Sequence, residues 1–278
     1  MTFIALEQII GVMQDTLQII PIPAFKDNYI WLIHNGRVAI VVDPGDAAPV
    51  LETLNHLNLQ LHTILITHHH HDHIDGVSSL LDVFTDADIY APKLEKYAFK
   101  HNAVNETDVI ELADFNIKAT VIEVPGHTLG HVAYYIKPLE SQNKIDNDGG
   151  LLFCGDTLFG AGCGRLFEGT ATQMLDSLNK LVTLPANTKV YCTHEYTLHN
   201  INFALSLEPN NQALIERFGE TVKLRNAQQP SLPSSISLEL ATNPFLRCNS
   251  SEIKSSLRLL NASYLETFSA IRELRNHY

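Results

Sequence analysis

The sequence predicts an α/β domain of about 190 residues followed by a mostly helical tail. Short apolar stretches with strand character alternate with helical stretches as far as residue 192, and strand signals become sparse beyond that point. Four of the strand candidates end in side chains that bind metals, which indicates a site at one edge of the sheets. With 278 residues, 45% of them hydrophobic, the chain can bury the core of one large domain or of a domain with an appendage.

The first elements are short strands. Residues 17–22 and 28–33 are rich in Ile and aromatic residues, and residues 38–42 form a third apolar run. Asn35-Gly36 stands between the second and third runs and is a strong signal for a hairpin turn. The sequence therefore predicts strand, strand, turn and strand in this order.

The pattern then changes to helical spacing. Residues 47–59 place apolar side chains on one helix face, residues 61–66 form a buried strand, and residues 74–84 predict the next helix. Between this strand and helix lies the segment THHHHDH at 67–73, which holds five of the 14 histidines. We therefore expect this cluster at the carboxyl end of a strand, where open α/β sheets place their sites.

The rest of the chain adds further strands and the tail. The remaining strand candidates are residues 89–91, 118–124, 132–136, 151–154 and 189–192, with a polar turn at 141–150 and a helix at 173–181. In the tail we expect mostly helix at 199–228, a Ser/Pro-rich strap at 230–246 and one amphipathic helix at 251–276. The predicted domains are an N-terminal extension (1–14, disordered), a catalytic domain (15–190) and a helical substrate-binding domain (191–278).

Composition limits the partners. A net charge of −12 and a pI near 5.5 argue against binding nucleic acid, whose phosphates call for clustered Lys and Arg. No run approaches the ~20 apolar residues of a membrane span. The four cysteines form no C-x-x-C pair, which indicates free thiols in a reducing compartment. We expect a soluble, cytoplasmic monomer that contacts neither membrane nor nucleic acid.

Seven potential metal ligands follow four strand candidates. They are His68, His70, Asp72 and His73 after the first, His127 after the second, Asp156 after the third and His194 after the fourth. Taken singly, His127 reads as an ordinary loop histidine and Asp156 as a helix cap. Jointly, five imidazoles and two carboxylates suit two borderline-soft divalent ions about 3.5–4 Å apart, with one carboxylate bridging them.

The spacing inside the histidine cluster divides its members between the two ions. In an extended loop, side chains alternate, so His68 and His70 point the same way and both face one ion. Asp72 and His73 begin the helix and are redirected to a second ion, whereas His69 and His71 point away. Asp43 follows another strand and is either a partner of a ligand histidine or a residue of the turn before Pro44-Gly45.

These motifs resemble the metallo-β-lactamase superfamily, whose T-H-x-H-x-D-H string is complete here. Within it the chain resembles the glyoxalase II (hydroxyacylglutathione hydrolase) family, from about residue 16 into the tail. The motifs that carry this resemblance are FKDNY (25–29), THHHHDH (67–73), PGHT (125–128), GDTLF (155–159), GCGR (162–165), CTHEYT (192–197) and NPFLR (243–247). The resemblance implies a four-layer αββα sandwich followed by a helical domain that helps to bind glutathione.

The resemblance also implies roles for single residues. It assigns His68, His70 and His127 to one metal, Asp72, His73 and His194 to the other, and Asp156 to the bridge. It makes zinc the first expectation for both ions, with iron or manganese as alternatives. It implies substrate contacts by Arg165, Phe167, Tyr196, Arg272 and Arg275. By pattern alone, the two arginines near the C-terminus would form a solvated helix face.

Three departures concern substrate binding. Arg165 and Arg275 stand where the family frequently has Lys, which keeps the charge. Phe167 stands where Tyr is frequent, and one lost hydrogen bond to a charged ligand costs ~1.5–3 kcal/mol.

The resemblance implies hydrolysis of S-D-lactoylglutathione to D-lactate and glutathione, as part of methylglyoxal detoxification. Two cations lower the pKa of a shared water from ~15.7 to near 7 and so supply hydroxide at neutral pH. Asp72 and His73 are the expected catalytic residues, with Asp72 both binding a metal and orienting the water.

Three alternatives remain. A persulfide dioxygenase of the same superfamily would hold a single iron and would not need Asp72 and His194 as ligands. A β-lactamase or lactonase would lack the glutathione-binding tail. A metal-buffering protein would bind metal without turnover, and it gives no reason for the C-terminal arginines.

Overall fold

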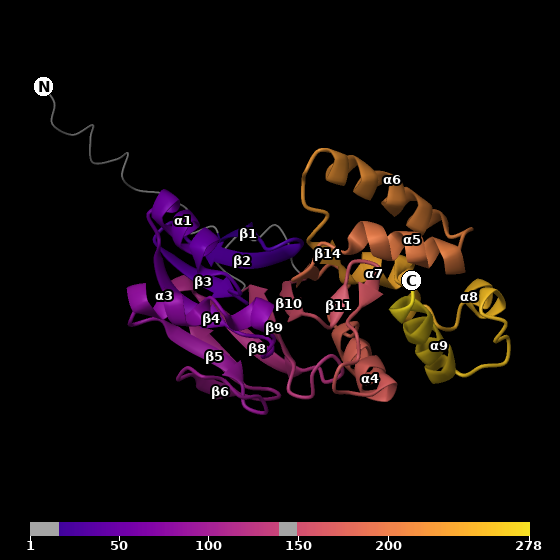
Figure 1. The fold of residues 1–278 in the computed structure, drawn as a ribbon, viewed down its shortest axis with the longest axis horizontal. Helices are drawn as coiled ribbons and strands as arrows, with labels where there is room; N and C mark the ends of the chain where they lie inside the picture. The colour runs from indigo at the N-terminus through magenta and orange to yellow at the C-terminus, as the bar shows by residue number, and fades with distance from the viewer. Residues whose placement is uncertain (1–16, 139–148) are drawn as a thin grey trace, which may run out of the picture.

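The computed structural model describes residues 17–138 and 149–278, which form two six-stranded sheets with helices around them (Figure 1). The expected N-terminal extension at 1–14 lies outside the described residues, as does most of the expected polar turn at 141–150. Within the described ranges, no helix is long and apolar enough to cross a membrane.

The first sheet has the strand order β1-β2-β3-β4-β5-β6. Its strands are β1 (Gln18–Ala24), β2 (Asn28–His34), β3 (Val38–Val42), β4 (Gln60–Leu65), β5 (Asp88–Pro92) and β6 (Asn102–Val104). The first three pair antiparallel and the rest parallel. The predicted hairpin turn is confirmed at Gly36, whose φ of +86° suits a residue without a side chain.

Alternation along β2 explains how this sheet separates two cores. Ile30 and Leu32 point to the outer face, where they pack with Val50 and Leu54 of α1 (Ala47–Leu57). α3 (Val77–Val83) covers the same face. Ile33 points the other way, into the core between the sheets.

The second sheet has the strand order β14-β13-β10-β9-β8-β7. Its strands are β7 (Val109–Leu112), β8 (Ile117–Glu123), β9 (Val132–Pro138), β10 (Leu151–Gly155), β13 (Lys189–Cys192) and β14 (Ser234–Ser235). α4 (Ala171–Leu181) starts with a capping box between Thr170 and Gln173 and packs its apolar side chains into the core of this sheet. The helix–sheet–sheet–helix layering confirms the predicted fold class.

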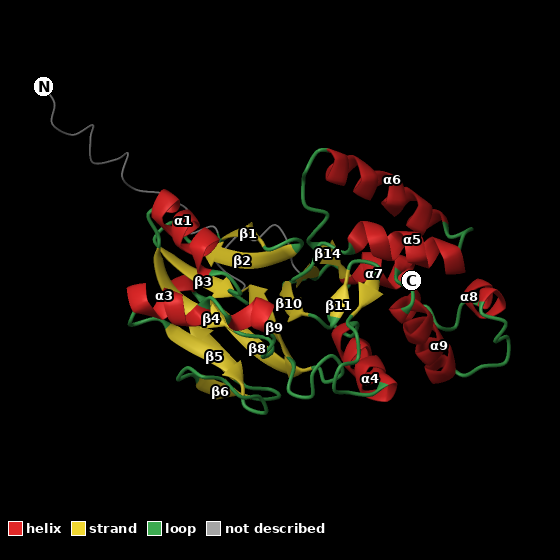
Figure 2. Cartoon of the chain, in the orientation of Figure 1, coloured by secondary structure: helices red, strands yellow, loops and turns green. Residues whose placement is uncertain are grey.

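The tail is helical, as Figure 2 shows, but its elements differ from the prediction. Residues 199–228 form two helices, α5 (Thr197–Leu207) and α6 (Gln212–Asn226). The strap contains the helix α7 (Ile236–Thr242), and its strand β14 pairs with β13, so the tail completes the second sheet.

The prediction of one helix at 251–276 was wrong. The segment forms α8 (Ser251–Ser256) and α9 (Tyr264–Asn276). α9 begins after the N-cap residue Ser263. The Ser263 side chain accepts a hydrogen bond from the Glu266 amide, and the Glu266 carboxylate accepts one from the Ser263 amide. This S-x-x-E capping box is a start signal in the sequence itself.

Short strands were missed. They are β6, β7, β14, and the pair β11 (Leu158–Phe159) and β12 (Gly162–Cys163). Two- to four-residue strands hold too few residues for an alternating pattern, so pairing with a distant neighbour decides them.

Candidate active site

The four strand ends with potential ligands meet at one edge of the two sheets. His68 and His70 follow β4, and Asp72 and His73 lie in the one-turn helix α2 (His71–Ile74). The other three follow β8, β10 and β13 and are His127, Asp156 and His194. Gly155 permits this approach, because a Cβ there would lie 2.3 Å from the Thr67 Oγ1 atom.

His68, His70 and His127 form one compact group. The His70 Nδ1 atom lies 3.1 Å from His68 Nε2 and 3.0 Å from His127 Nε2. Burial, together with the neighbouring His127, lowers the pKa of His70 to about 4. Burial also lowers the pKa values of His68 and His127, so all three imidazoles are neutral near pH 7, the form that binds a metal.

Asp72, His73 and His194 form a second group. The Asp72 Oδ2 atom lies 3.7 Å from His73 Nε2 and 3.5 Å from His194 Nε2. Asn28 donates a hydrogen bond of 2.9 Å to the same carboxylate oxygen and fixes its orientation.

Asp156 lies between the two groups. Its carboxylate is 3.4 Å from His127 Nε2, 3.3 Å from His194 Nε2 and 3.5 Å from His73 Nε2. Burial alone would raise the pKa of Asp156, but the nearby His194 and His73 hold it below its usual value. This carboxylate is thus ionised and within reach of both groups, as a bridging ligand must be.

The donor set fits divalent cations. The His73 Nε2 and Asp156 Oδ1 atoms are buried and have no hydrogen-bond partner among the described residues. Buried polar atoms in native proteins are nearly always satisfied. A cation shared by imidazole nitrogens and carboxylate oxygens would satisfy both atoms, so the cluster is suited to hold divalent metal.

Residues behind the ligands hold two of the rings from the far side. The Asp27 Oδ1 atom lies 2.9 Å from His194 Nδ1, and the Arg165 carbonyl oxygen lies 2.9 Å from His127 Nδ1. Each contact turns the Nε2 atom of the ring toward the site, which is the usual arrangement behind metal-bound histidines.

Asp43 fulfils both of the readings that the sequence left open. Its φ is +53°, which fits a residue of a tight turn. Its carboxylate also accepts hydrogen bonds from the Thr67 amide and hydroxyl and lies 3.0 Å from His73 Nδ1. The turn therefore places a carboxylate behind a potential ligand.

His69 and His71 take part in neither group. The His69 ring lies 3.2 Å from the buried Glu95 carboxylate and 3.6 Å from that of Glu168. His71 is exposed and lies 3.0 Å from Asp75. The His71 side chain points into solvent, as the alternation along the loop predicts, whereas the His69 ring packs edge-on against that of His70 at a centroid distance of 5.2 Å.

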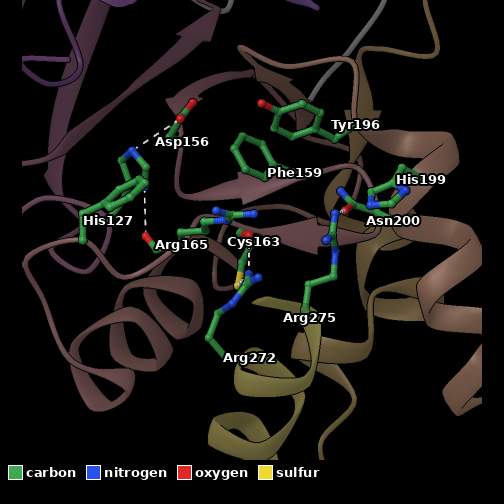
Figure 3. Close-up of a pocket in the computed structure, with 11 residues that line it drawn as sticks. His127, Asp156, Phe159, Cys163, Arg165, Tyr196, His199, Asn200, Arg272 and Arg275 are labelled. Carbon is green, nitrogen blue, oxygen red and sulfur yellow. Dashed lines mark hydrogen bonds and ion pairs between the residues drawn. The ribbon is translucent and has the colours of Figure 1, made fainter. Parts of the chain in front are cut away.

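A cavity of 440 Å³ adjoins the cluster and is lined by all five side chains expected to bind substrate (Figure 3). They are Arg165, Phe167, Tyr196, Arg272 and Arg275. His127 and Asp156 line the same cavity. Figure 3 shows Arg272 reaching toward Cys163 and Arg275 toward Asn200.

The two C-terminal arginines do not form a solvated face, as the pattern alone suggested. Arg272 is only 4% exposed, and its Nη1 donates to the carbonyl oxygens of Cys163 (2.8 Å) and Gly164 (3.3 Å). Arg275 is partly buried and donates to the Asn200 side-chain oxygen at 3.1 Å. Three guanidinium groups thus line the cavity, and their positive charge suits an anionic ligand.

The aromatic pair lies beside the cluster. The Tyr196 ring stacks on His194 at a centroid distance of 4.7 Å. The Phe167 ring lies 5.5 Å from His70 and 5.2 Å from His127 but is 63% exposed. Tyr196 brings a hydroxyl to the cavity, whereas Phe167 brings only apolar surface.

Sequence reasoning missed several residues of the site. His131 is fully buried, its ring stacks on His68 at 4.5 Å, and its Nε2 accepts a hydrogen bond from the Asp156 amide. A histidine just before a strand, four positions after His127, was the available signal. Phe159, Cys163, His199 and Asn200 also line the cavity. Phe159 and Cys163 belong to the GDTLF and GCGR motifs, whereas nothing in the local sequence marks His199 and Asn200.

Comparison with known proteins gives two family matches. A model described as "Metallo-beta-lactamase superfamily" matches residues 25–139, and one described as "Hydroxyacylglutathione hydrolase C-terminus" matches residues 195–278. The hydroxyacylglutathione hydrolase of Methylobacillus flagellatus is 52% identical over 261 residues, covering 94% of this chain and 99% of that protein. The hydroxyacylglutathione hydrolase of Pseudomonas aeruginosa is 52% identical over 241 residues, covering 86% of this chain and 89% of that protein.

Solved structures agree on the fold. The BLEG-1 B3 metallo-beta-lactamase superposes with a TM-score of 0.58 at 24% identity, covering 84% of this chain and 100% of that one. ETHE1 from Myxococcus xanthus superposes with a TM-score of 0.60 at 22% identity, covering 93% of this chain and 97% of that one. At these identities the likeness establishes the metallo-β-lactamase fold alone.

Proposed function

Because the chain belongs to the hydroxyacylglutathione hydrolase family of the metallo-β-lactamase superfamily, we propose that it hydrolyses S-D-lactoylglutathione to D-lactate and glutathione. The observation that carries the proposal is that one cavity joins the His/Asp cluster to three arginines. A glutathione thioester needs both features, because it brings carboxylates to be bound and a carbonyl to be attacked.

The ligand roles follow from the two groups. His68, His70 and His127 would hold one ion, Asp72, His73 and His194 the other, and Asp156 both. Imidazole and carboxylate ligands suit zinc, and they accept iron or manganese as well. Zinc remains the first expectation.

Two ions held in this way would supply Lewis-acid chemistry, which would lower the pKa of a bound water and polarise a carbonyl. The protein's own residues orient the ligand side chains and the attacking water. Asn28 fixes the Asp72 carboxylate, Asp43 lies behind His73, and Asp72 and His73 are the residues proposed to face the attacking water.

The leaving group needs little help. A thiol with a pKa near 8.5 departs readily as thiolate, so no general acid is required. The protein's own thiols are poor nucleophiles, because burial raises the pKa values of Cys163 and Cys192. Hydrolysis without a protein-bound acyl intermediate follows.

We divide the chain as predicted, into a catalytic part (15–190) and a substrate-binding part (191–278). Support comes from α9, which contributes two arginines to the cavity. A reducing, cytoplasmic setting is supported by the four free cysteines. A monomer remains our expectation.

The proposed function is tested with two substrates that share the D-lactoyl group. One is S-D-lactoylglutathione and the other is the same acyl group on a small neutral thiol. We expect kcat/KM to be about 100-fold higher for the glutathione thioester, because its charged groups gain hydrogen bonds worth ~1.5–3 kcal/mol each. Equal values for the two substrates would refute glutathione recognition.

Replacing both Arg272→Ala and Arg275→Ala should raise KM for S-D-lactoylglutathione by about 10- to 100-fold and change kcat far less. The reason is that the two guanidinium groups bind the substrate away from its reacting carbonyl. Steady-state kinetics measures both constants. The matched control is Arg37→Ala, which removes an exposed arginine elsewhere. An unchanged KM in the double variant would remove these residues from the site.

A further inference from the structure

Residues 159–164, here called the pocket loop, are held almost entirely by side chains of the helical tail. The loop supplies Phe159 and Cys163 to the cavity lining. The tail side chains that hydrogen-bond to its backbone are Asn200 (to Gly160 O), Glu239 (from Ala161 N), Asn243 (to Phe159 O and Gly162 O) and Arg272 (to Cys163 O and Gly164 O). Every residue of the loop thus has a backbone atom fixed by the tail.

The loop would not keep this shape alone. Its own pairing consists of the two-residue strands β11 and β12. Ala161 has a φ of +54°, in the left-handed region that is unfavourable for a residue with a side chain. Its amide donates a hydrogen bond of 2.8 Å to Glu239, which offsets that cost.

Glu239 and Asn243 form the centre of this support. Both are fully buried. The Asn243 side-chain amide donates to Gly162 O and to Glu239 Oε2, each at 2.9 Å, and its oxygen accepts from the Phe245 amide. The other Glu239 oxygen, Oε1, accepts from Arg217 at 2.6 Å. The pair therefore has one orientation, with its remaining hydrogen-bonding capacity directed at the loop.

Neither residue is among those that line the cavity in the described part of the chain. We propose that Asn243 and Glu239 are positioning residues for substrate binding, which act by holding the pocket loop in the shape that receives the glutathione thioester. The inference rests on the proposed function for its substrate. It explains why a helical tail and a metal-binding sandwich belong to one substrate site.

The test uses two asparagines with matched roles. Asn243 and Asn211 each cap a helical turn through the side-chain oxygen and donate from the side-chain nitrogen to distant partners. Only the partners of Asn243 belong to the pocket loop. Serine keeps the cap in both places and cannot reach those partners.

Asn243→Ser should raise KM for S-D-lactoylglutathione about tenfold, with kcat changed less than about threefold and metal content unchanged. Asn211→Ser should leave KM unchanged. An unchanged KM in Asn243→Ser, or a tenfold rise in both variants, would overturn the proposal. Glutathione binding by calorimetry should weaken in parallel with KM, which a general loss of stability would not produce.

Hydrogen exchange on the unaltered, metal-loaded protein tests the same claim without a variant. The Ala161 amide should exchange as slowly as the amides of β10, because its acceptor is a buried carboxylate. Rapid exchange at Ala161 would refute the claim that the tail holds the pocket loop, even if Asn243→Ser does not fold. If the unaltered protein fails to hydrolyse the thioester, the proposed function falls, and exchange at Ala161 still decides whether the tail holds the loop.

Discussion

Asp156→Asn is expected to lower kcat/KM for S-D-lactoylglutathione by about a thousandfold, or roughly 4 kcal/mol of transition-state stabilisation. The carboxylate lies within 3.3 to 3.5 Å of three histidine nitrogens that belong to two different groups. An amide of the same shape offers one neutral oxygen and cannot bridge two cations. Metal analysis should therefore find fewer than two ions per chain, and steady-state kinetics measures the loss in kcat/KM.

The control for this variant is Asp82→Asn, which makes the same chemical change at an exposed position of α3. It should retain full activity and metal content. If Asp156→Asn kept both ions and its full rate, Asp156 would not be the bridge, and the two groups would have to act separately.

His70→Ala and His71→Ala should differ by about a thousandfold in kcat/KM, although the two residues are adjacent. His70 Nδ1 lies 3.1 Å and 3.0 Å from the nearest nitrogens of His68 and His127, whereas the exposed His71 ring lies 3.0 Å from Asp75. Loss of His70 removes a potential metal ligand from the first group. Loss of His71 removes a surface ion pair, which contributes little to stability.

The measurement is kinetics on both variants, with thermal unfolding to confirm that each is folded. His71→Ala should behave as the unaltered protein. A comparable loss of kcat/KM in both variants would mean that the histidines of the cluster bind metal without distinct roles. Alternation of side chains along the loop predicts the opposite.

The ligand cluster could be predicted because metal binding demands few residue types, and the chain places them directly after apolar strands. His127, Asp156 and His194 carry little information singly. Three strands ending in such residues, together with the 67–73 segment, predict a shared site if the strands lie with the same edge up, and the structure brings their ligands together. Alternation of side chains along the loop predicted separately that His69 and His71 are not ligands.

The support of the pocket loop could not be predicted from the sequence. The bond from Ala161 to Glu239 joins residues 78 positions apart, and the one from Arg272 to Cys163 spans 109. Such contacts depend on how α7 and α9 pack, and no local pattern encodes that packing. Arg272 looked solvated for the same reason.

The break between α8 and α9 is a different case, because its signal was present. Apolar spacing continues across residues 251–276, and the S-x-x-E motif at Ser263 outweighs it. A capping box satisfies amides that a continuous helix would bond internally, so two helices form.

The most direct test of a two-metal thioester hydrolase is to measure metal content and S-D-lactoylglutathione hydrolysis before and after chelation. We expect two divalent ions per chain, loss of activity when a chelator removes them, and recovery when zinc, iron or manganese is restored. The seven side chains that would hold the ions are His68, His70, Asp72, His73, His127, Asp156 and His194. Undiminished hydrolysis by the metal-free protein, or two bound ions without any hydrolysis, would contradict the account.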